Sequence, residues 1–396
     1  MTNVDLLFDK INTGREGKNI GLKTGIEKLD KYIGGIQRGV YTLIFGLSGA
    51  SKTGLALYMI YRTLKDNPEK DIKYIYFSLE MAAELLLAKL MCLYMYEEFG
   101  IVISYTELMS WEEILSDEKY NYIQKSKVWL SEISDKLLIF DKALSAKSFY
   151  RTTMSLLEEW GSFTESVDGR RKIYNKTNPE QYVIVVVDHV GLCVPETGNS
   201  KKQEIDLISQ YAVNLRERCQ VSFFMLQQEN RNSANMDRRK MDMTECSSED
   251  LKDTGNTFND CQVCLGVYYP LKHKLKTHRG YPIINDTCSD FKGLRDRYRA
   301  ICLIKNRMGV SDRVIPVNFM GEIGYYRNLP KPEEISDWKP YLSLEIKDSE
   351  TEDVPENKSQ EPINSFNFLY NPFSLFLISL KEDSILQLHK SIMPIL

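Results

Sequence analysis

The segment Gly46-Leu-Ser-Gly-Ala-Ser-Lys52-Thr53 constrains the fold of this chain more than any other part of its sequence. It follows the apolar run YTLIF (41–45) and precedes GLALYMIYRTLK (54–65), whose apolar residues recur at helical spacing. In a loop between a strand and a helix, backbone N–H groups and the helix dipole favour an anion. The pattern predicts a phosphate-binding loop, whose contact residues are expected to be Gly46, Ser48, Gly49, Ala50, Ser51, Lys52 and Thr53. The alternative is an ordinary strand-to-helix turn with a chance Lys-Thr pair.

This loop matches the pattern G-x-x-x-x-G-K-[ST] except at Ser51, which replaces the last glycine. In that pattern the lysine, here Lys52, holds the β- and γ-phosphates of ATP, and the hydroxyl of Thr53 ligates Mg²⁺. The Cβ atom of Ser51 would lie close to the phosphates, although Gly49 keeps some flexibility nearby. The sequence therefore predicts binding of ATP and Mg²⁺ and leaves the rate of hydrolysis open.

Apolar, strand-like runs alternate with amphipathic, helix-like stretches up to residue 226. This alternation predicts an α/β fold with a doubly wound, mainly parallel sheet that helices cover on both faces. A polar stretch at 229–258 is expected to form a loop with a short helix, and the strands after it predict an antiparallel C-terminal extension of the sheet. Strands are expected at 41–45, 72–79, 137–140, 182–188, 221–226, 261–269, 298–305, 313–319 and 324–327, and helices at 25–32, 54–65, 82–98, 146–160 and 203–218.

Two carboxylates stand at the ends of predicted parallel strands. Asp188 ends the run YVIVVVD, and Glu80 ends the run in FSLEM. The carboxyl ends of parallel strands meet at one edge of a sheet, where such folds bind ligands. There Asp188 can hold the shell of Mg²⁺ through water, and Glu80 can orient and deprotonate an attacking water. Glu80 as a simple cap of the helix that begins near Ala82 is the alternative, but the loop and both carboxylates together favour catalysis.

Several short motifs resemble those of the DnaB-type hexameric replicative DNA helicases. They follow the phosphate-binding loop in the family's order, after a similar lead-in, TGIEKLDKYIGGIQRG (24–39). The resemblance covers about residues 20–330 and implies a RecA-like P-loop ATPase motor. The motifs are FSLEM (77–81), VVVDHVGL (185–192), LQQENRN (226–232), SEDLKDTGN (248–256) and IKNRMG (304–309).

The resemblance implies a role for five residues. Glu80 is similar to the catalytic glutamate and Asp188 to the Walker-B aspartate. Gln228 resembles the glutamine that senses the γ-phosphate and relays the nucleotide state to the DNA loops. Lys305 and Arg307 resemble the basic pair that reaches into the neighbouring subunit's ATP, with Arg307 as the arginine finger. A solvated strand end is the alternative for this pair.

The implied activity is ATP-dependent unwinding of duplex DNA by a homo-oligomeric, hexameric ring that translocates on single-stranded DNA. Primase, a loader or other replication proteins would be its partners. His189 stands where the family more often has an aromatic residue. Fewer than 25 residues precede the motor, which leaves no room for the family's N-terminal domain. Two other classes stay open: a RecA- or KaiC-like recombinase or regulatory ATPase, and a degenerate nucleotide-binding module, suggested by Ser51, that loads or regulates a partner.

Basic side chains are concentrated where such a ring would meet DNA. The loops after the Asp188 and Gln228 strands would face the central channel and follow a phosphate backbone without reading sequence. The stretch 267–313 holds eleven Lys and Arg against four Asp, and the insertion expected at about 270–297 lies within it. That insertion is expected either to contact DNA or a partner or to form a solvated surface. The expected DNA-binding residues are Lys201, Lys202, Arg231, Arg238, Arg239 and Lys240.

Composition sets the remaining expectations. The net charge is −4, although residues 331–362 alone hold ten acidic and four basic side chains. We expect a lead-in (1–20), a motor domain (21–330), a disordered acidic linker (331–362) and an apolar tail (363–396) that either docks a partner or packs on the motor. Eight scattered cysteines, no basic-then-apolar leader and no run of about 20 apolar residues predict a cytoplasmic protein, of a host cell if phage-encoded, without a membrane contact.

Cys261, Cys264, His273 and His278 form a set with zinc-like residue types. In a strand, however, residues three apart point to opposite faces. The alternation in CQVCLGVY therefore favours a half-buried strand over a zinc site.

Overall fold

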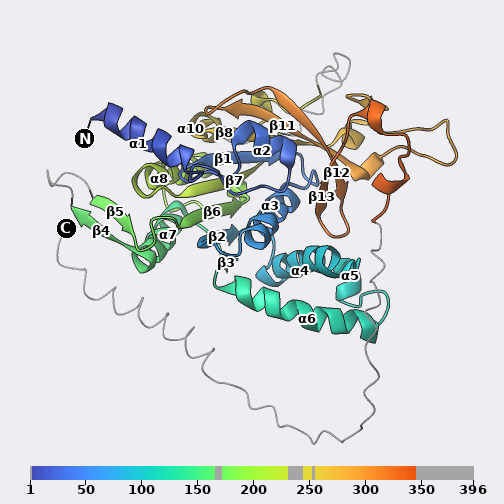
Figure 1. Ribbon diagram of the computed structural model, residues 1–396, viewed down its shortest axis with the longest axis horizontal. Helices are drawn as coiled ribbons and strands as arrows, with labels where there is room; N and C mark the ends of the chain where they lie inside the picture. The colour runs from blue at the N-terminus through green and yellow to red at the C-terminus, as the bar shows by residue number, and fades with distance from the viewer. Residues whose placement is uncertain (1, 166–171, 231–243, 252–254, 345–396) are drawn as a thin grey trace, which may run out of the picture. The chain divides into compact units, whose positions relative to one another are not determined.

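The computed structural model describes residues 2–165, 172–230, 244–251 and 255–344. Its centre is a nine-stranded sheet with the order β13-β12-β11-β8-β1-β7-β6-β2-β3 (Figure 1). The strands are β1 (Tyr41–Gly46), β2 (Ile72–Ser78), β3 (Leu137–Phe140), β6 (Tyr182–Asp188), β7 (Ser222–Gln228), β8 (Val263–Tyr268), β11 (Tyr298–Asn306), β12 (Arg313–Met320) and β13 (Tyr325–Asn328).

Strand direction divides this sheet into two parts. β8, β1, β7, β6, β2 and β3 pair in parallel, whereas β11 is antiparallel to both β8 and β12, and β12 is antiparallel to β13. The predicted mainly parallel sheet with an antiparallel C-terminal extension is thereby confirmed. Strand β1 is the middle strand of the nine, so the loop that follows it lies at the centre of the sheet edge.

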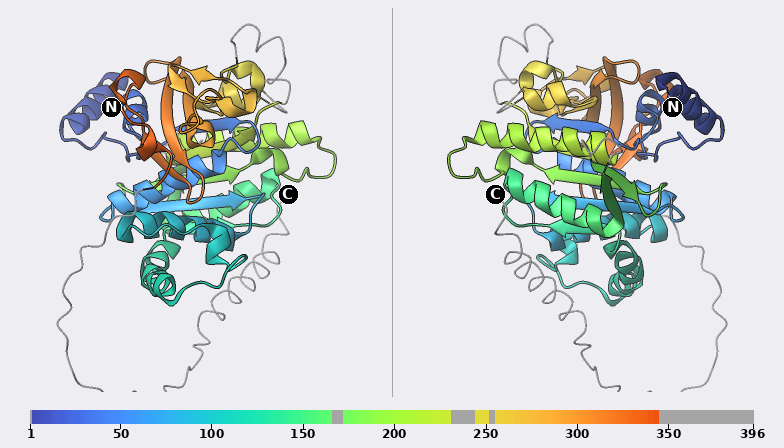
Figure 2. Two further views of the ribbon diagram at one scale, coloured as in Figure 1. Left: turned by 90° about the vertical axis from the view of Figure 1, so that its right-hand side faces the viewer. Right: turned by 90° about the vertical axis from the view of Figure 1, so that its left-hand side faces the viewer.

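Helices cover both faces of the parallel part, because its strands are apolar at almost every position. Alternate residues of one strand enter different cores: Ile44 packs with α2, α3 and α4, while Leu43 and Phe45 pack with α7 and α8. Figure 2 shows α7 and α8 across one face of the sheet. The helices are α1 (Asn3–Arg15), α2 (Glu27–Ile33), α3 (Lys52–Asp66), α4 (Ala83–Phe99), α5 (Tyr105–Leu108), α6 (Asp117–Ser134), α7 (Ala146–Trp160), α8 (Lys201–Cys219) and α10 (Asn256–Asp260).

Short elements complete the described part of the chain. Two small hairpins lie outside the main sheet, formed by β4 (Gly161–Glu165) with β5 (Lys172–Lys176) and by β9 (Thr277–His278) with β10 (Tyr281–Pro282). The short 3₁₀-helices are η1 (Val190–Leu192), η3 (Ser248–Asp250), η4 (Pro270–His273), η5 (Arg295–Arg297), η6 (Pro332–Glu334) and η7 (Lys339–Tyr341).

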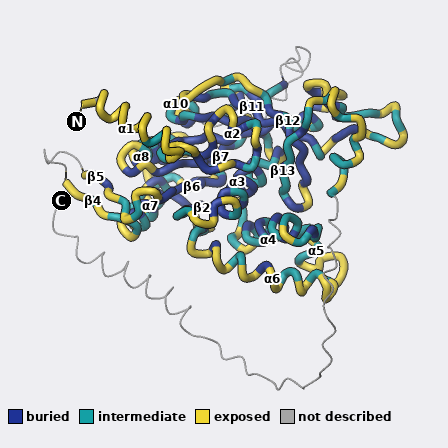
Figure 3. The backbone as a smooth tube through the Cα atoms, viewed as in Figure 1, coloured by how far each residue is buried: buried dark blue, intermediate teal, exposed yellow. Residues whose placement is uncertain are grey.

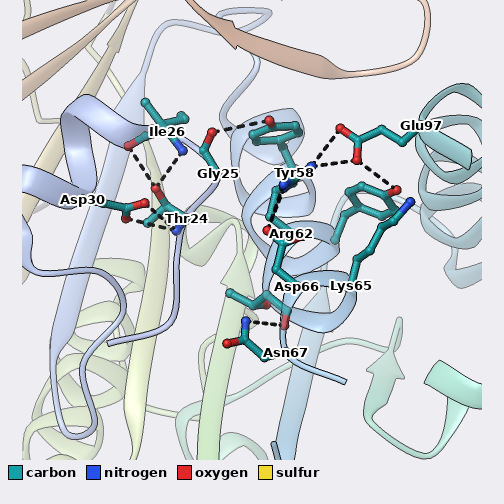
Figure 4. Close-up of polar contacts among 12 residues, drawn as sticks. Thr24, Gly25, Ile26, Asp30, Tyr58, Arg62, Lys65, Asp66, Asn67 and Glu97 are labelled. Atoms are coloured by element: carbon teal, nitrogen blue, oxygen red, sulfur yellow. Dashed lines mark hydrogen bonds and ion pairs between the residues drawn. The ribbon is translucent and has the colours of Figure 1, made fainter. Parts of the chain in front are cut away.

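Polar contacts fix the helix that follows the phosphate-binding loop. Arg62 of α3 donates to both carboxylate oxygens of Glu97 on α4, at 2.9 and 2.7 Å, and pairs with Asp66 one turn further along α3 (Figure 4). In the lead-in, the backbone N–H of Thr24 donates to the carboxylate of Asp30 at the end of a short loop before α2. Such bidentate, charge-assisted contacts set orientation as well as distance. Helix α3 therefore has a fixed direction relative to α4.

Helix α1 was not predicted, because residues 1–20 were expected to be only a lead-in. It begins at a capping box between Thr2 and Asp5. Its apolar side chains Val4, Leu7, Phe8 and Ile11 are each about half exposed or more, so the helix has an uncovered apolar stripe (Figure 3). Within the described part of the chain, no helix is long and apolar enough to cross a bilayer.

The expectation of a disordered linker from residue 331 is wrong for residues 331–344. This segment contains η6 and η7, and its aromatic residues pack on the motor domain. The ring of Trp338 stacks on Phe291 at 5.9 Å, and the Arg327 guanidinium lies 4.7 Å from the Tyr341 ring centroid. The acidic composition of 331–362 masked these anchors. Residues 345–362 and the expected tail at 363–396 lie outside the described residues.

Candidate active site

The loop after β1 has the conformation that a phosphate-binding loop needs. Helix α3 begins at Lys52, and its N-cap, Ser51, has φ 78° and ψ 39°. This is the left-handed region that favours glycine, the residue that the sequence pattern expects here. Gly49 also has a positive φ, of 73°. The backbone therefore follows the path of the motif even though Ser51 carries a side chain.

Gly54 makes room for the Ser51 side chain. A Cβ atom added at Gly54 would collide with the hydroxyl oxygen of Ser51. The hydroxyl therefore occupies the space over the first turn of α3 that the missing side chain leaves open. The sequence suggested that Ser51 would crowd the phosphates, but its hydroxyl lies against Gly54 instead.

Side chains from distant parts of the chain hold the loop carbonyls. Lys52 Nζ donates to the carbonyl oxygens of Gly46 and Leu47, at 3.0 and 3.2 Å. The buried Arg299 donates through Nε to the Ala50 carbonyl at 3.1 Å, and the hydroxyl of Tyr326 donates to Ser51 O at 3.0 Å. Because these contacts fix the carbonyls, the loop keeps its shape without a bound anion.

The two predicted carboxylates come from neighbouring strands. Ser78 of β2 pairs with Asp188 of β6, so Glu80, two residues after Ser78, lies at the same edge as Asp188. Asp188 is 2% exposed, and its Oδ2 accepts a hydrogen bond of 2.7 Å from the Tyr76 hydroxyl. Glu80 is different, since 59% of its side chain is exposed and its Oε2 lies 4.0 Å from His189 Nε2. The structure therefore places a buried and an accessible carboxylate side by side.

Asp188 has the surroundings of a group that holds a cation. Burial raises the pKa of Asp188, and hydrogen bonds from the Thr53 and Tyr76 side chains oppose that rise. Its Oδ1 atom is buried and makes no hydrogen bond of ordinary geometry to any described residue. A buried carboxylate oxygen beside the Thr53 hydroxyl fits the hard-oxygen donors that Mg²⁺ prefers. These residues fit the predicted metal role.

Lys52 lies between the loop and these acids. Burial lowers the pKa of the Lys52 ammonium, while the charges of Asp188, Glu80 and Glu229 act to raise it. The buried ammonium is thus held by acidic neighbours and loop carbonyls. A polyanion would gain from it, because burial weakens the screening of its charge.

A cavity of about 210 Å³ joins the predicted residues. Gln228, the last residue of β7, reaches this cavity because it pairs with Gly46 of β1. A second cavity of about 210 Å³ adjoins the first and shares Ser51, Thr53 and Met81 with it. The first cavity is lined by Ser48, Gly49, Ser51, Lys52, Thr53, Glu80, Met81, His189 and Gln228.

Comparison with known proteins assigns the family. The model of the DnaB-like helicase C-terminal domain matches residues 21–328, which is more than half of the chain. The chain belongs to this family. It is therefore a helicase-type ATPase domain, and the resemblance carried by FSLEM and the motifs after it is confirmed. No curated protein sequence is similar enough to count as a relative.

Two solved structures share the fold of this DnaB-like domain. One is an isolated ATPase domain with a TM-score of 0.63 and 18% identity, and the match covers 83% of this chain and 100% of that one. The other, a DnaB-like replicative helicase solved in a study of its interactions with primase, has a TM-score of 0.61 and 19% identity, with 83% and 67% covered. The RecA-like fold predicted from the sequence is thereby confirmed.

Lys305 and Arg307 lie at the opposite edge of the sheet from the phosphate-binding loop. Strand β8 runs parallel to β1, and β11 runs antiparallel to β8, so the carboxyl end of β11 lies beside the start of β1. There the Arg307 backbone N–H donates to Gln262 O, and its guanidinium donates to Asn259 O at 2.9 Å. Lys305 Nζ donates to the Phe258 and Asn259 carbonyls. In this DnaB-like domain, the pair cannot reach its own loop.

The predicted DNA-binding residues are only partly described. Lys201 and Lys202 were expected in the loop after β6, but both are in the first turn of α8, which Ser200 caps. Both side chains are exposed, and Lys201 Nζ donates to Gly191 O at 2.9 Å. Four further predictions, Arg231, Arg238, Arg239 and Lys240, lie outside the described residues.

The zinc-like set does not converge on one point. Among the described residues, no group of three or more His, Cys, Asp or Glu side chains could hold a metal ion. His278 is instead buried between Glu245, 2.8 Å from its Nε2, and the Tyr298 hydroxyl, 2.7 Å from its Nδ1. Arg279 donates to the same glutamate at 2.8 and 2.9 Å. This network ties the insertion to the segment that begins at residue 244.

Sequence reasoning missed three residues of the site: Tyr76, Arg299 and Tyr326. Tyr76 stands two residues before Ser78 and so faces the same side of the sheet, which makes its contact with Asp188 predictable once the strand pairing is known. Arg299 is a cation within the apolar run YRAICLIK, and a buried charge of this kind marks a specific partner. Nothing in the local sequence distinguishes Tyr326 from the neighbouring tyrosine.

Proposed function

We propose that this domain is the ATP-driven motor of a ring-shaped replicative DNA helicase, which translocates on single-stranded DNA and unwinds the duplex. The observation that carries the proposal is the single cavity lined by the loop, Glu80 and Gln228. Phosphate, a water-activating carboxylate and a γ-phosphate contact would meet there. The membership of the DnaB-like family supports the choice of a helicase over other P-loop enzymes.

The chain's own residues have separate tasks in this proposal. Lys52 and the loop N–H groups bind the β- and γ-phosphates, and Thr53 and Asp188 hold Mg²⁺, directly or through water. When bound, Mg²⁺ neutralises charge that develops on the phosphate oxygens. Glu80, which is accessible to water, orients and deprotonates the attacking water. Gln228 contacts the γ-phosphate and transmits its presence along β7 towards the loop that follows.

Two observations support a ring of identical subunits. Arg307 and Lys305 lie too far from their own loop, so they serve ATP only if a second copy places its loop against them. Helix α1 exposes Val4, Leu7, Phe8 and Ile11, an apolar stripe of the kind that protein partners cover. Lys201, Lys202 and the four basic residues of 231–240 would line the DNA channel. By analogy with the primase-interacting neighbour, a primase is a candidate partner.

The test is an ATPase assay with and without single-stranded DNA, beside unwinding of a forked duplex. We expect DNA to stimulate hydrolysis, and Lys52→Ala to abolish both activities. Hydrolysis that ignores DNA and survives Lys52→Ala would refute the proposal. Filaments on single-stranded DNA without unwinding would indicate a recombinase-like protein, and tight ATP binding without turnover would indicate a regulatory module.

A further inference from the structure

A second lysine lies at the phosphate-binding loop. Lys272, in η4 at the start of the insertion, donates from Nζ to the carbonyl oxygen of Ser48. The same ammonium lies 3.0 Å from the position that a Cβ atom on Gly49 would take. Ser48 and Gly49 both line the cavity described above. A charge from the insertion, which was predicted to serve DNA, a partner or solvent, therefore lies on the nucleotide site.

The backbone around Lys272 is held in place, while its side chain is exposed. Its N–H donates to Tyr269 O at 3.1 Å. The next residue, His273, is buried with its ring 5.2 Å from that of Tyr268. The guanidinium of Arg299 lies 3.4 Å from the Tyr269 ring centroid and also holds the loop through Ala50 O. The position of Lys272 is thus tied to that of the loop.

The two lysines are arranged around one short stretch of backbone. Lys52 donates to the Gly46 and Leu47 carbonyls, and Lys272 donates to the next one, that of Ser48. Their like charges oppose each other: after burial, the charge of Lys272 also acts to lower the pKa of Lys52. Two ammonium groups in such an arrangement gain most from an anion that both can contact. An ammonium has three donors, so a contact with one carbonyl leaves others for phosphate oxygens.

We propose that Lys272 is a second phosphate-binding lysine, which contacts the terminal phosphates of ATP from the antiparallel side of the sheet. This proposal rests on the function proposed above and adds a residue to it. The competing interpretation is that Lys272 only straps the loop through Ser48 O. In that case the loss of its charge would weaken the binding of every adenine nucleotide to a similar degree.

The experiment measures binding of Mg-ATP, Mg-ADP and AMP to the full chain by calorimetry, without DNA. The variants are Lys272→Ala, Lys272→Arg and, as a matched control, Lys276→Ala, which removes another exposed lysine of the insertion. We expect Lys272→Ala to weaken ATP binding about tenfold, the usual effect of losing one charge-assisted hydrogen bond. ADP should lose less, and AMP binding should not change. Lys272→Arg should restore part of the ATP affinity.

Each other outcome overturns the proposal in a recognisable way. If Lys272→Ala binds ATP as tightly as Lys276→Ala, while Lys52→Ala loses binding, the proposed function stands and the role of Lys272 is refuted. An equal loss for ATP, ADP and AMP supports the strap and also refutes the phosphate contact. If the unaltered chain binds no ATP, both proposals fail. Thermal unfolding of the two alanine variants at equal midpoints checks that neither effect comes from misfolding.

Discussion

The parallel and antiparallel parts of the sheet contribute different chemistry to the same site. The parallel strands β1, β2, β6 and β7 end in the loop, Glu80, Asp188 and Gln228, so they supply both carboxylates and the lysine of the motif. The antiparallel strands supply Arg299 and Tyr326, which hold the loop from outside. Because direction alternates in this part, it also places Arg307 at the far edge. The parallel part thus forms the reaction centre, and the antiparallel part supports one centre and faces another.

The loss of Arg307 should have the largest effect if the far edge serves a second subunit. Arg307→Ala is expected to lower ATP hydrolysis about 10³-fold while nucleotide binding is retained, since an arginine finger acts mainly in the transition state. Mixing Arg307→Ala with Lys52→Ala subunits should recover activity, because the second variant still offers Arg307 to the intact loop of the first. Mixtures no more active than the separate variants would contradict action between subunits.

Glu80→Gln tests the parallel part alone. The variant keeps the size of the side chain and removes the base, so hydrolysis should fall about 10²- to 10³-fold. ATP affinity should change little, because Glu80 is more than half exposed and is assigned to water rather than to phosphate. Single-turnover hydrolysis and equilibrium binding measure the two quantities. A loss of binding equal to the loss of rate would show that Glu80 has a different role.

The pairing of Ser51 with Gly54 makes a prediction about packing. Gly54→Ala should destabilise the domain by about 1–3 kcal/mol and raise the KM for ATP, because the new methyl group meets the Ser51 hydroxyl. The double variant Ser51→Gly with Gly54→Ala should recover both properties. Ser51→Gly alone should stabilise the domain by about 1 kcal/mol, since it removes a left-handed serine. Denaturant unfolding measures the stabilities, and an unrescued double variant would disprove the pairing.

The smallest effect is expected for Glu245, which joins the insertion to residue 244 and its neighbours. Burial acts to raise its pKa, but hydrogen bonds from His278 and Arg279 and the Arg279 charge outweigh it and lower the pKa to about 2, from an ordinary 4.5. A lowered pKa stabilises the fold above pH 4.5, and this stabilisation is lost as the pH falls towards 2. Glu245→Gln should therefore cost about 1 kcal/mol at pH 7 and less at pH 4.

Thermal unfolding at the two pH values gives the comparison, with the unaltered chain beside the variant. A difference that stays constant between pH 7 and pH 4 would mean that the ion pairs of Glu245 do not contribute to stability.

The parallel part could be predicted from the sequence because its pattern is local. Each strand is an apolar run, and the functional residue follows at its carboxyl end, as for Asp188 and Glu80. The antiparallel part does not have this property: β11 brings Arg299 to the loop and Arg307 to the opposite edge, only eight positions apart in the chain. Helix α1 was missed because its apolar residues have no core to indicate them, and Trp338 was hidden within an acidic stretch. Both depend on tertiary packing or on a partner.

The anchoring of the loop has a consequence for how the protein is made. The side chains that hold the carbonyls of Ser48, Ala50 and Ser51 come from residues 224, 249 and 275 positions further along the chain. A ribosome releases the motif itself early, long before Tyr326 leaves the exit tunnel. The growing chain would hold an unsupported loop during this interval, and ATP could help it fold only after the last strands have joined the sheet.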